Sequence, residues 1–260
     1  MDNVVNVALL AVLQGVAEFL PISSSGHLVI AQRLLGVNEP GIRLEVMLHL
    51  GTLASIAVYY RAALARLILG CLRFQREQLR LAGYIVLSAV PAILIYFPFK
   101  DRIEAFYEQP RAVGGFLVFT GAILLFLRWI RHGGSSVNAP RALVIGLAQA
   151  FAILPGVSRS GMTIAAARMT EVKPEEAAEF SFLMSLPLLA GGALLDLISS
   201  FRHAAPPSSI PEWQIWFGAG LAAVIGFVAL SLLVKTLKSG YFWVFGVYCV
   251  IAGLLVSVLL

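Results

Sequence analysis

The sequence predicts an all-α integral membrane protein, with six transmembrane helices and two re-entrant helical hairpins arranged as an inverted-topology repeat. Three observations lead to this fold class. The 260 residues are 59% hydrophobic and only 13% charged, with a mean hydropathy of +0.88, whereas a soluble domain carries about 25% charged residues. Six apolar runs are long enough to cross a bilayer, which takes about 20 residues. Two further apolar stretches are interrupted by polar segments that look like copies of each other.

The six apolar runs define the expected crossings. In chain order they cover residues 44–60, 81–98, 112–130, 176–198, 214–235 and 241–260. The two interrupted stretches, 4–35 and 141–170, carry Pro and Gly in the middle, which is typical of hairpins that stop near the membrane midplane. Non-helical backbone at that depth is tolerated only where it lines a cavity enclosed by protein. We therefore expect both hairpin tips to face one enclosed polar site.

The two interrupting segments, 14–27 and 149–163, share one layout. Each opens with a Gln and has a Gly twelve positions later, with a Pro and a cluster of Ser between them. This likeness indicates two repeat halves, about 1–130 and 141–260, that share a single membrane domain over residues 1–260.

Basic residues are distributed unevenly among the connections between these runs. Twelve lie in 61–80, 128–141, 168–175 and 235–240, and six lie in the remaining connections. By the positive-inside rule the first set is cytoplasmic, with 61–80 as a loop. Three crossings then separate the hairpins, so the halves have opposite orientations. Inverted repeats with midplane sites are the usual architecture of secondary transporters. A membrane transporter is therefore the alternative function.

Other classes of protein are excluded or disfavoured. The net charge of +5 does not indicate nucleic-acid binding, because the basic residues lie in short loops between apolar runs. Cys71 and Cys249 lie in a basic loop and an apolar run, so neither a disulfide nor a cysteine metal site is expected. The first apolar run lacks a basic region before it, so no removable signal peptide is expected. A structural scaffold would give no reason to bury the polar segments.

The first polar segment carries acid–base chemistry. Gln14 and Glu18 are four residues apart and share one face of a helix. An unpaired carboxylate in hydrocarbon is expensive, so we expect Glu18 to be a general base or metal ligand, with Gln14 in support. His27 has a pKa suited to moving protons and is a second candidate. Between them a helix start offers hydroxyl and backbone N–H groups to an anion; it consists of Ser23, Ser24, Ser25 and Gly26.

The second polar segment carries a cation and more hydroxyls. Arg159 offers a fork of donors that suits phosphate. An ion pair with Glu18 is an alternative role for Arg159, and the two roles are compatible. Ser158, Ser160 and Thr163 add hydroxyl groups at another helix start. His49 lies in an apolar run, and we expect it to be a supporting residue bonded to a neighbour.

These residues closely resemble the undecaprenyl-diphosphate phosphatase family, also known as the bacitracin-resistance family. One matching motif is Gln-x-x-x-Glu followed by Ser-Ser-Ser-Gly-His, within 14–27, and the other is Pro-Gly-x-Ser-Arg-Ser-x-x-Thr at 155–163. Segments 45–52 and 179–187 are also similar to the family. Gln14 stands where the family also has glutamate, which weakens any mechanism that needs two acids there.

The resemblance implies hydrolysis of polyprenyl diphosphate to the monophosphate and inorganic phosphate, which recycles the lipid carrier of cell-wall synthesis. It implies a divalent cation, Mg²⁺ or Ca²⁺, with Glu18 as its ligand. It also implies a multi-pass protein of the inner (plasma) membrane whose site opens to the outer face. Membrane lipids are the expected surroundings. The sequence does not decide between a monomer and a homodimer. The positions that match the family's catalytic residues are Glu18, Ser24, His27 and Arg159. Those that match its phosphate-binding neighbourhood are Ser23, Ser25, Gly26, Ser158, Ser160 and Thr163.

Two mechanisms fit these residues. In one, Ser24 attacks the terminal phosphorus and His27 takes or relays the proton. In the other, water attacks directly, with Glu18 or His27 as base. The sequence does not separate them. In both, Arg159 and the helix starts hold the phosphates.

Overall fold

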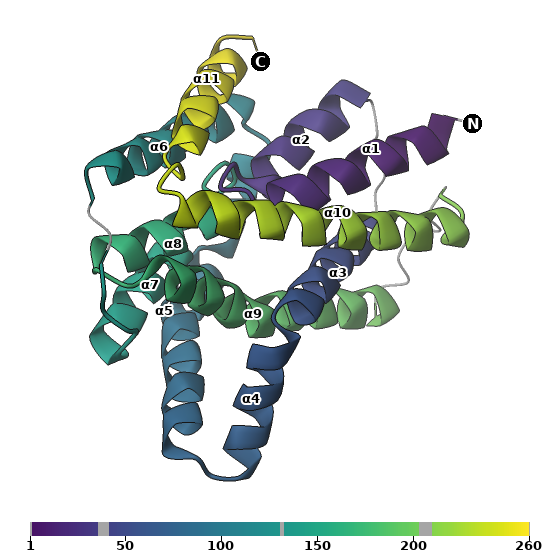
Figure 1. The fold of residues 1–260 in the computed structure, drawn as a ribbon. Helices are drawn as coiled ribbons and strands as arrows, with labels where there is room; N and C mark the ends of the chain where they lie inside the picture. The colour runs from purple at the N-terminus through teal and green to yellow at the C-terminus, as the bar shows by residue number, and fades with distance from the viewer. Residues whose placement is uncertain (1, 36–41, 131–132, 203–209, 260) are drawn as a thin grey trace.

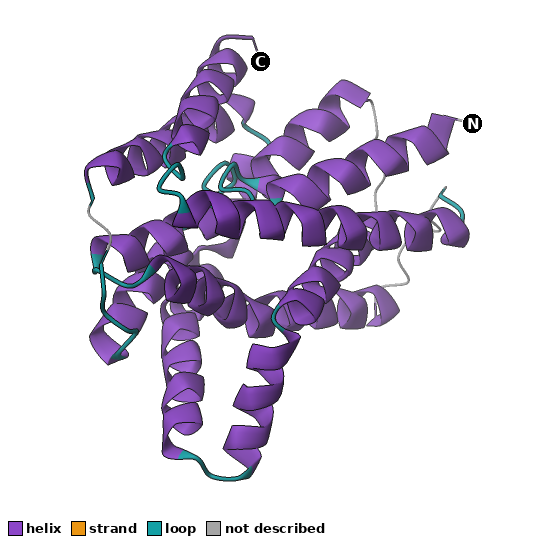
Figure 2. Cartoon of the chain, in the orientation of Figure 1, coloured by secondary structure: helices purple, strands orange, loops and turns teal. Residues whose placement is uncertain are grey.

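The computed structural model describes residues 2–35, 42–130, 133–202 and 210–259. Within these ranges the regular elements are helices (Figures 1 and 2), apart from one isolated bridge between Ser135 and Val172. The all-α class is confirmed. In chain order the helices are α1 (Asp2–Ala17), α2 (Ser24–Leu35), α3 (Ile42–Tyr59), α4 (Arg61–Leu72), α5 (Arg76–Tyr107), α6 (Pro110–Phe126), η1 (Leu127–Trp129), α7 (Ala139–Phe151), α8 (Arg159–Met169), α9 (Pro174–Arg202), α10 (Glu212–Lys238) and α11 (Val244–Leu259).

The described helices include four that are long and apolar enough to cross a membrane. They are α5, α6 extended through η1 to Trp129, α9 as far as Leu195, and α10. A fifth span arises only if α3 and α4 count together, and these two helices meet at a bend of 78°. The expected crossing at 241–260 is α11, a shorter apolar helix of 16 residues. The chain is therefore a multi-pass membrane protein, while the count of six crossings stays a prediction.

Residues 61–80 were expected to form a loop, and this expectation is wrong because most of them are helical. Helix α4 and the start of α5 occupy most of it, and only residues 73–75 separate them. In Figure 1 the two helices project together from the body of the molecule. The arginines of this segment suggested a loop. The Ala and Leu residues between them are strong helix formers and favour a helix. Phe74 closes α4 with a φ of 54°, and the Gln75 N–H donates to the Gly70 carbonyl at 2.8 Å.

Each interrupted stretch forms a pair of short helices joined by an irregular turn. Helices α1 and α2 flank residues 18–23, and α7 and α8 flank residues 152–158. Each turn touches the start of the second helix of the other hairpin, and Gly161 at the start of α8 lies against Pro21. A Cβ added to Gly26 would lie 3.0 Å from the Cα of Gly156. Gly156 itself has a φ of 95° and packs so closely on Val113 that no side chain fits there. The structure therefore brings the two polar segments into one place.

Each hairpin packs on a long helix from the other half of the chain. Helix α1 lies along α10, and α7 lies along α5. If the two halves are equivalent, exchanging them turns the pairing of α1 with α10 into the pairing of α7 with α5. The pairing of α6 with α11 is kept by the same exchange. The division into repeats near 1–130 and 141–260 stays a prediction. The contact of α6 with α11 is close, because a Cβ on Gly253 would lie 2.5 Å from the Gly114 carbonyl. Small residues at such crossings let helix backbones approach in a membrane.

Candidate active site

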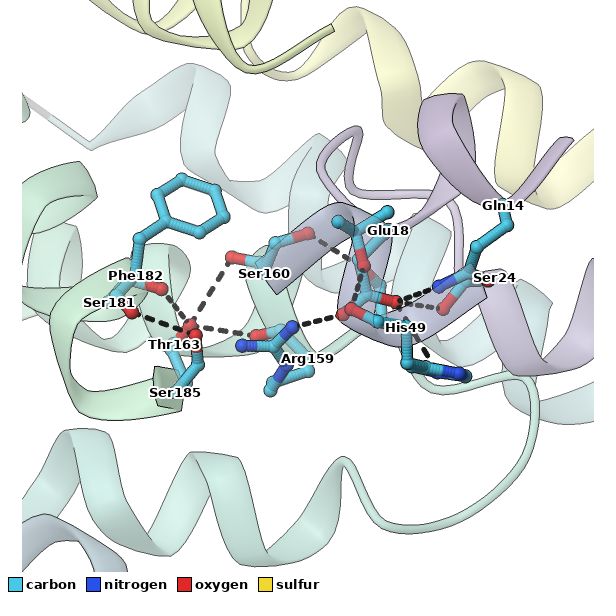
Figure 3. A network of polar contacts seen from close by, with 12 residues as sticks. Gln14, Glu18, Ser24, His49, Arg159, Ser160, Thr163, Ser181, Phe182 and Ser185 are labelled. Carbon is cyan, nitrogen blue, oxygen red and sulfur yellow. Dashed lines mark hydrogen bonds and ion pairs between the residues drawn. The ribbon is translucent and has the colours of Figure 1, made fainter. Parts of the chain in front are cut away.

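Glu18 lies at the centre of the polar contacts between the hairpin tips (Figure 3). Its side chain is only 4% exposed, and its Oε1 accepts an ion-pair hydrogen bond from Arg159. Its Oε2 accepts hydrogen bonds from Gln14 Nε2 at 3.1 Å and from Ser24 Oγ at 2.7 Å. His49 Nε2 lies 3.9 Å from the same oxygen. Four helices, α1, α2, α3 and α8, therefore place side chains around one carboxylate.

Ser24 is the first residue of α2, and its hydroxyl donates to Glu18. In the covalent mechanism the expected acceptor of the Ser24 proton is His27, but among the described contacts the acceptor is the Glu18 carboxylate. A charge-assisted hydrogen bond of this length is among the stronger kinds in proteins. The structure therefore places the Ser24 hydroxyl directly against the Glu18 carboxylate.

His27 has a different set of partners. Its Nδ1 lies 2.9 Å from the Ser23 carbonyl oxygen, and its Nε2 lies 2.7 Å from the hydroxyl of Tyr248 on α11. The two rings are stacked, with centroids 5.6 Å apart. Sequence reasoning missed Tyr248, because a tyrosine in an apolar run looks like an ordinary interfacial aromatic.

His49 makes the local bond that was expected and also faces the site. Its Nδ1 lies 2.8 Å from the Glu45 carbonyl oxygen, one turn earlier in α3. That bond turns Nε2 towards Glu18, and the His49 side chain is 32% exposed. His49 thus adds a partly exposed polar group beside the buried carboxylate.

The hydroxyls of the second hairpin are engaged with the protein. Ser158 caps α8 by accepting from the Gly161 N–H at 3.1 Å. Ser160 donates to the Leu20 carbonyl at 3.4 Å, which ties the two tips together. Thr163 is fully buried, and its hydroxyl bonds the Arg159 carbonyl at 2.7 Å and also bonds Ser181. Direct contact of these three hydroxyls with phosphate stays a prediction, because the described contacts assign them to capping and packing.

Arg159 is partly exposed, whereas Ser158, Ser160 and Thr163 beside it are buried. Its side chain is 19% exposed while it pairs with Glu18. A guanidinium carries five N–H donors, so the contact with one carboxylate oxygen leaves others for a ligand. The expected ion pair with Glu18 is confirmed, and the expected role in phosphate binding is compatible with it.

The serines of the first hairpin surround the start of α2. Ser23 is buried and has a φ of 71°, and its hydroxyl lies 3.4 Å from both the Gly26 N–H nitrogen and Ser25 Oγ. Ser24 and Ser25 are partly exposed. This helix start therefore offers an accessible end where backbone N–H groups favour an anion.

Oxygen donors that fit a hard divalent cation lie beside this helix start. Gln14 is fully buried, and its Oε1 has no hydrogen-bond partner among the residues that the structure describes. The amide oxygen belongs to the same side chain that bonds the Glu18 carboxylate. Within the described ranges no group of three or more His, Cys, Asp or Glu gathers around a metal position. One carboxylate and one amide oxygen suit Mg²⁺ or Ca²⁺, which take their remaining ligands from water and substrate phosphate.

Comparisons with known proteins agree with these observations. The family described as bacitracin resistance protein BacA matches residues 7–255. The chain is 37% identical over 260 residues to an undecaprenyl-diphosphatase of Geobacter metallireducens, and the match covers 96% of each chain. It is 39% identical over 253 residues to an undecaprenyl-diphosphatase of Syntrophotalea carbinolica, with 94% of each chain covered. A third relative with this name, from Rhodopirellula baltica, is 35% identical over 262 residues. The chain therefore belongs to the bacitracin resistance protein BacA family.

Proposed function

We propose that this chain is an integral membrane phosphatase that hydrolyses undecaprenyl diphosphate to undecaprenyl phosphate and inorganic phosphate. The observation that carries the proposal is the convergence of a hydroxyl, a carboxylate and a guanidinium at one buried point: Ser24 and Arg159 both donate to Glu18. A nucleophile with its base, beside a fixed cation, is what phosphoryl transfer needs. The relatives that share the family are named for this reaction. The reaction returns the lipid carrier to cell-wall synthesis.

In the first step Ser24 Oγ bonds the terminal phosphorus. The bond from that phosphorus to the bridging oxygen breaks, and the lipid phosphate leaves with the electron pair. The Ser24 proton passes to Glu18 Oε2, which already accepts it at 2.7 Å. Arg159 keeps its contact with Glu18 Oε1 and directs its remaining N–H donors to the phosphate oxygens, while Oε2 takes the proton. Charge stabilisation by such fixed donors supplies much of the catalysis in phosphoryl transfer.

In the second step water attacks the phosphoserine and releases inorganic phosphate. Glu18 returns its proton to Ser24 as the bond between serine and phosphorus breaks. The proton lost by the water goes to Nε2 of His27, which lies three residues from Ser24 and therefore on the same face of α2. The hydrogen bond from the Ser24 hydroxyl to Glu18 supports covalent attack by Ser24 over direct attack by water.

Gln14 and Glu18 would hold the divalent cation, Mg²⁺ or Ca²⁺. When bound, the cation neutralises negative charge on the phosphate oxygens. Gln14 contributes the amide oxygen, and its N–H group keeps Glu18 oriented at 3.1 Å.

The plasma membrane is the proposed location, with the site open to the outer face. The excess of basic residues in the connections 61–80, 128–141, 168–175 and 235–240 supports this orientation. The first hairpin then enters from outside and carries Ser24 at the start of α2. The diphosphate approaches between the tips while the prenyl chain stays in lipid.

Phosphate release from undecaprenyl diphosphate by purified protein in detergent tests the proposal. Wild type would be measured with and without Mg²⁺ or Ca²⁺, beside Arg159→Ala and the exposed control Arg61→Ala. We expect metal-dependent release by wild type and by the control, and loss of release in Arg159→Ala. Absence of release from folded wild type in every metal would reject the phosphatase and favour a lipid-phosphate transporter.

A further inference from the structure

The last helix, α11, holds the turn of the first hairpin through two neighbouring residues. Tyr248 lies with its hydroxyl 2.7 Å from His27 Nε2, and the Cys249 thiol donates to the Pro21 carbonyl at 3.4 Å. These contacts join residues 221 and 228 positions apart in the sequence. Helix α11 is fixed on α6 by close glycine contacts, so the position of Tyr248 depends on rigid helices. The hairpin turn is therefore clamped from the opposite half of the chain.

The bonds of His27 define which of its nitrogens carries the proton. The Ser23 carbonyl can only accept, so Nδ1, at 2.9 Å from it, is the N–H donor. A neutral imidazole has one N–H, so Nε2 is an acceptor and the Tyr248 hydroxyl donates to it. The same Ser23 carbonyl also accepts from the His27 backbone N–H at 3.2 Å. One side of the ring is thus tied to its own helix start, and the other side to Tyr248.

Tyr248 also holds the plane of the imidazole. The two rings are stacked at an interplanar angle of 17°. Tyr248 is 45% exposed, so the protein does not enclose this pair of rings. Rotation of the Tyr248 hydroxyl about its C–O bond releases Nε2 without moving either ring. A neutral His27 with an available Nε2 is the form that accepts a proton.

We infer that Tyr248 is a positioning residue that keeps His27 in the Nδ1-protonated form, with Nε2 directed to accept a proton during hydrolysis. The inference rests on the proposed phosphatase function, because it assigns a use to this geometry. A purely structural role for Tyr248, as packing between α11 and α2, would need the ring and not the hydroxyl.

Kinetics separate these two roles. Tyr248→Phe keeps the ring and removes only the hydroxyl, and Tyr241→Phe, exposed just before α11, is the matched control. We expect Tyr248→Phe to lower kcat about tenfold, the effect of one lost hydrogen bond, with KM within about twofold of wild type. In a His27→Gln background the same change should have no further effect, because Tyr248 acts through His27. An unchanged kcat, or full additivity of the two changes, would overturn the inference.

A spectroscopic test works without turnover. In protein with ¹⁵N-labelled histidine, the two-dimensional NMR pattern of His27, assigned by its loss in His27→Gln, reports which ring nitrogen is protonated. We expect a neutral, Nδ1-protonated ring in wild type, and a changed Nε2 signal in Tyr248→Phe but not in Tyr241→Phe. An Nε2-protonated ring in wild type would contradict the inference. If wild type released no phosphate, the proposed function would fail while this measurement still decided the position of the proton.

Discussion

The hydroxyl of Ser24 lies 2.7 Å from Glu18 Oε2, across the turn that joins α1 to α2. Both residues belong to the first hairpin, so this hairpin alone carries the proposed nucleophile and its base. The second hairpin contributes a positively charged side chain, the guanidinium of Arg159. The two polar segments therefore have different chemical tasks despite their similar layout.

Ser24→Ala should reduce phosphate release at least about a hundredfold, because removal of the hydroxyl abolishes both the nucleophile and its bond to Glu18. Initial rates at saturating undecaprenyl diphosphate measure this, with the exposed Ser239→Ala as control. Substantial turnover by Ser24→Ala would show that water attacks the substrate directly.

Arg159→Lys should lower kcat/KM about a hundredfold, although the positive charge is kept. A lysine ammonium does not reproduce the fork by which arginine contacts a carboxylate and a phosphate together. The comparison of Arg159→Lys with Arg159→Ala, at constant metal concentration, measures what the fork contributes. Equal activity of wild type and Arg159→Lys would mean that charge alone is needed at this position.

Gln14→Leu should raise the metal concentration needed for half-maximal activity about 10- to 100-fold, because it removes the buried amide oxygen beside Glu18. Gln14→Glu places a carboxylate there and should lower the requirement below that of wild type. Titration of activity with Mg²⁺, together with calorimetric binding of the metal alone, checks both variants. A metal requirement unchanged in Gln14→Leu would remove Gln14 from the cation site.

Gly51→Ala should destabilise the fold by about 1–3 kcal/mol, because the added Cβ would lie 2.2 Å from the Ala219 carbonyl and force α3 away from α10. Thermal unfolding of the purified protein in detergent measures the loss. Gly83→Ala is the matched control, because a Cβ at that exposed position has nothing within 4 Å. Equal midpoints for the two variants would contradict the close packing of α3 on α10.

The convergence of the polar segments could be predicted because Glu18 needs partners wherever it is buried. A carboxylate in an apolar chain restricts the fold to arrangements that bring donors to it. Arg159 was identifiable for the same reason. The chemistry of these two side chains is enough to predict that they meet, whatever the packing of the helices.

The partner of His27 could not be predicted in this way. Tyr248 reaches His27 because α11 packs on α6 at one register, which depends on the fit of glycines along both helices. No local pattern in the apolar sequence records that register. Helix α4 shows the opposite difficulty, since its arginines suggested a loop while its alanines and leucines favour a helix.

Pairing of Glu18 with Arg159 also has a consequence for synthesis of the protein. The two residues are 141 positions apart, and ribosomes add about 5–20 residues per second. The first hairpin therefore exists for roughly 7–28 s before Arg159 is synthesised. A lone acidic group at the membrane centre costs about 2.5–3.5 kcal/mol on insertion scales. The first hairpin should thus wait near the lipid headgroups and enter its final position only when the second hairpin emerges, so that translation sets the time at which the site closes.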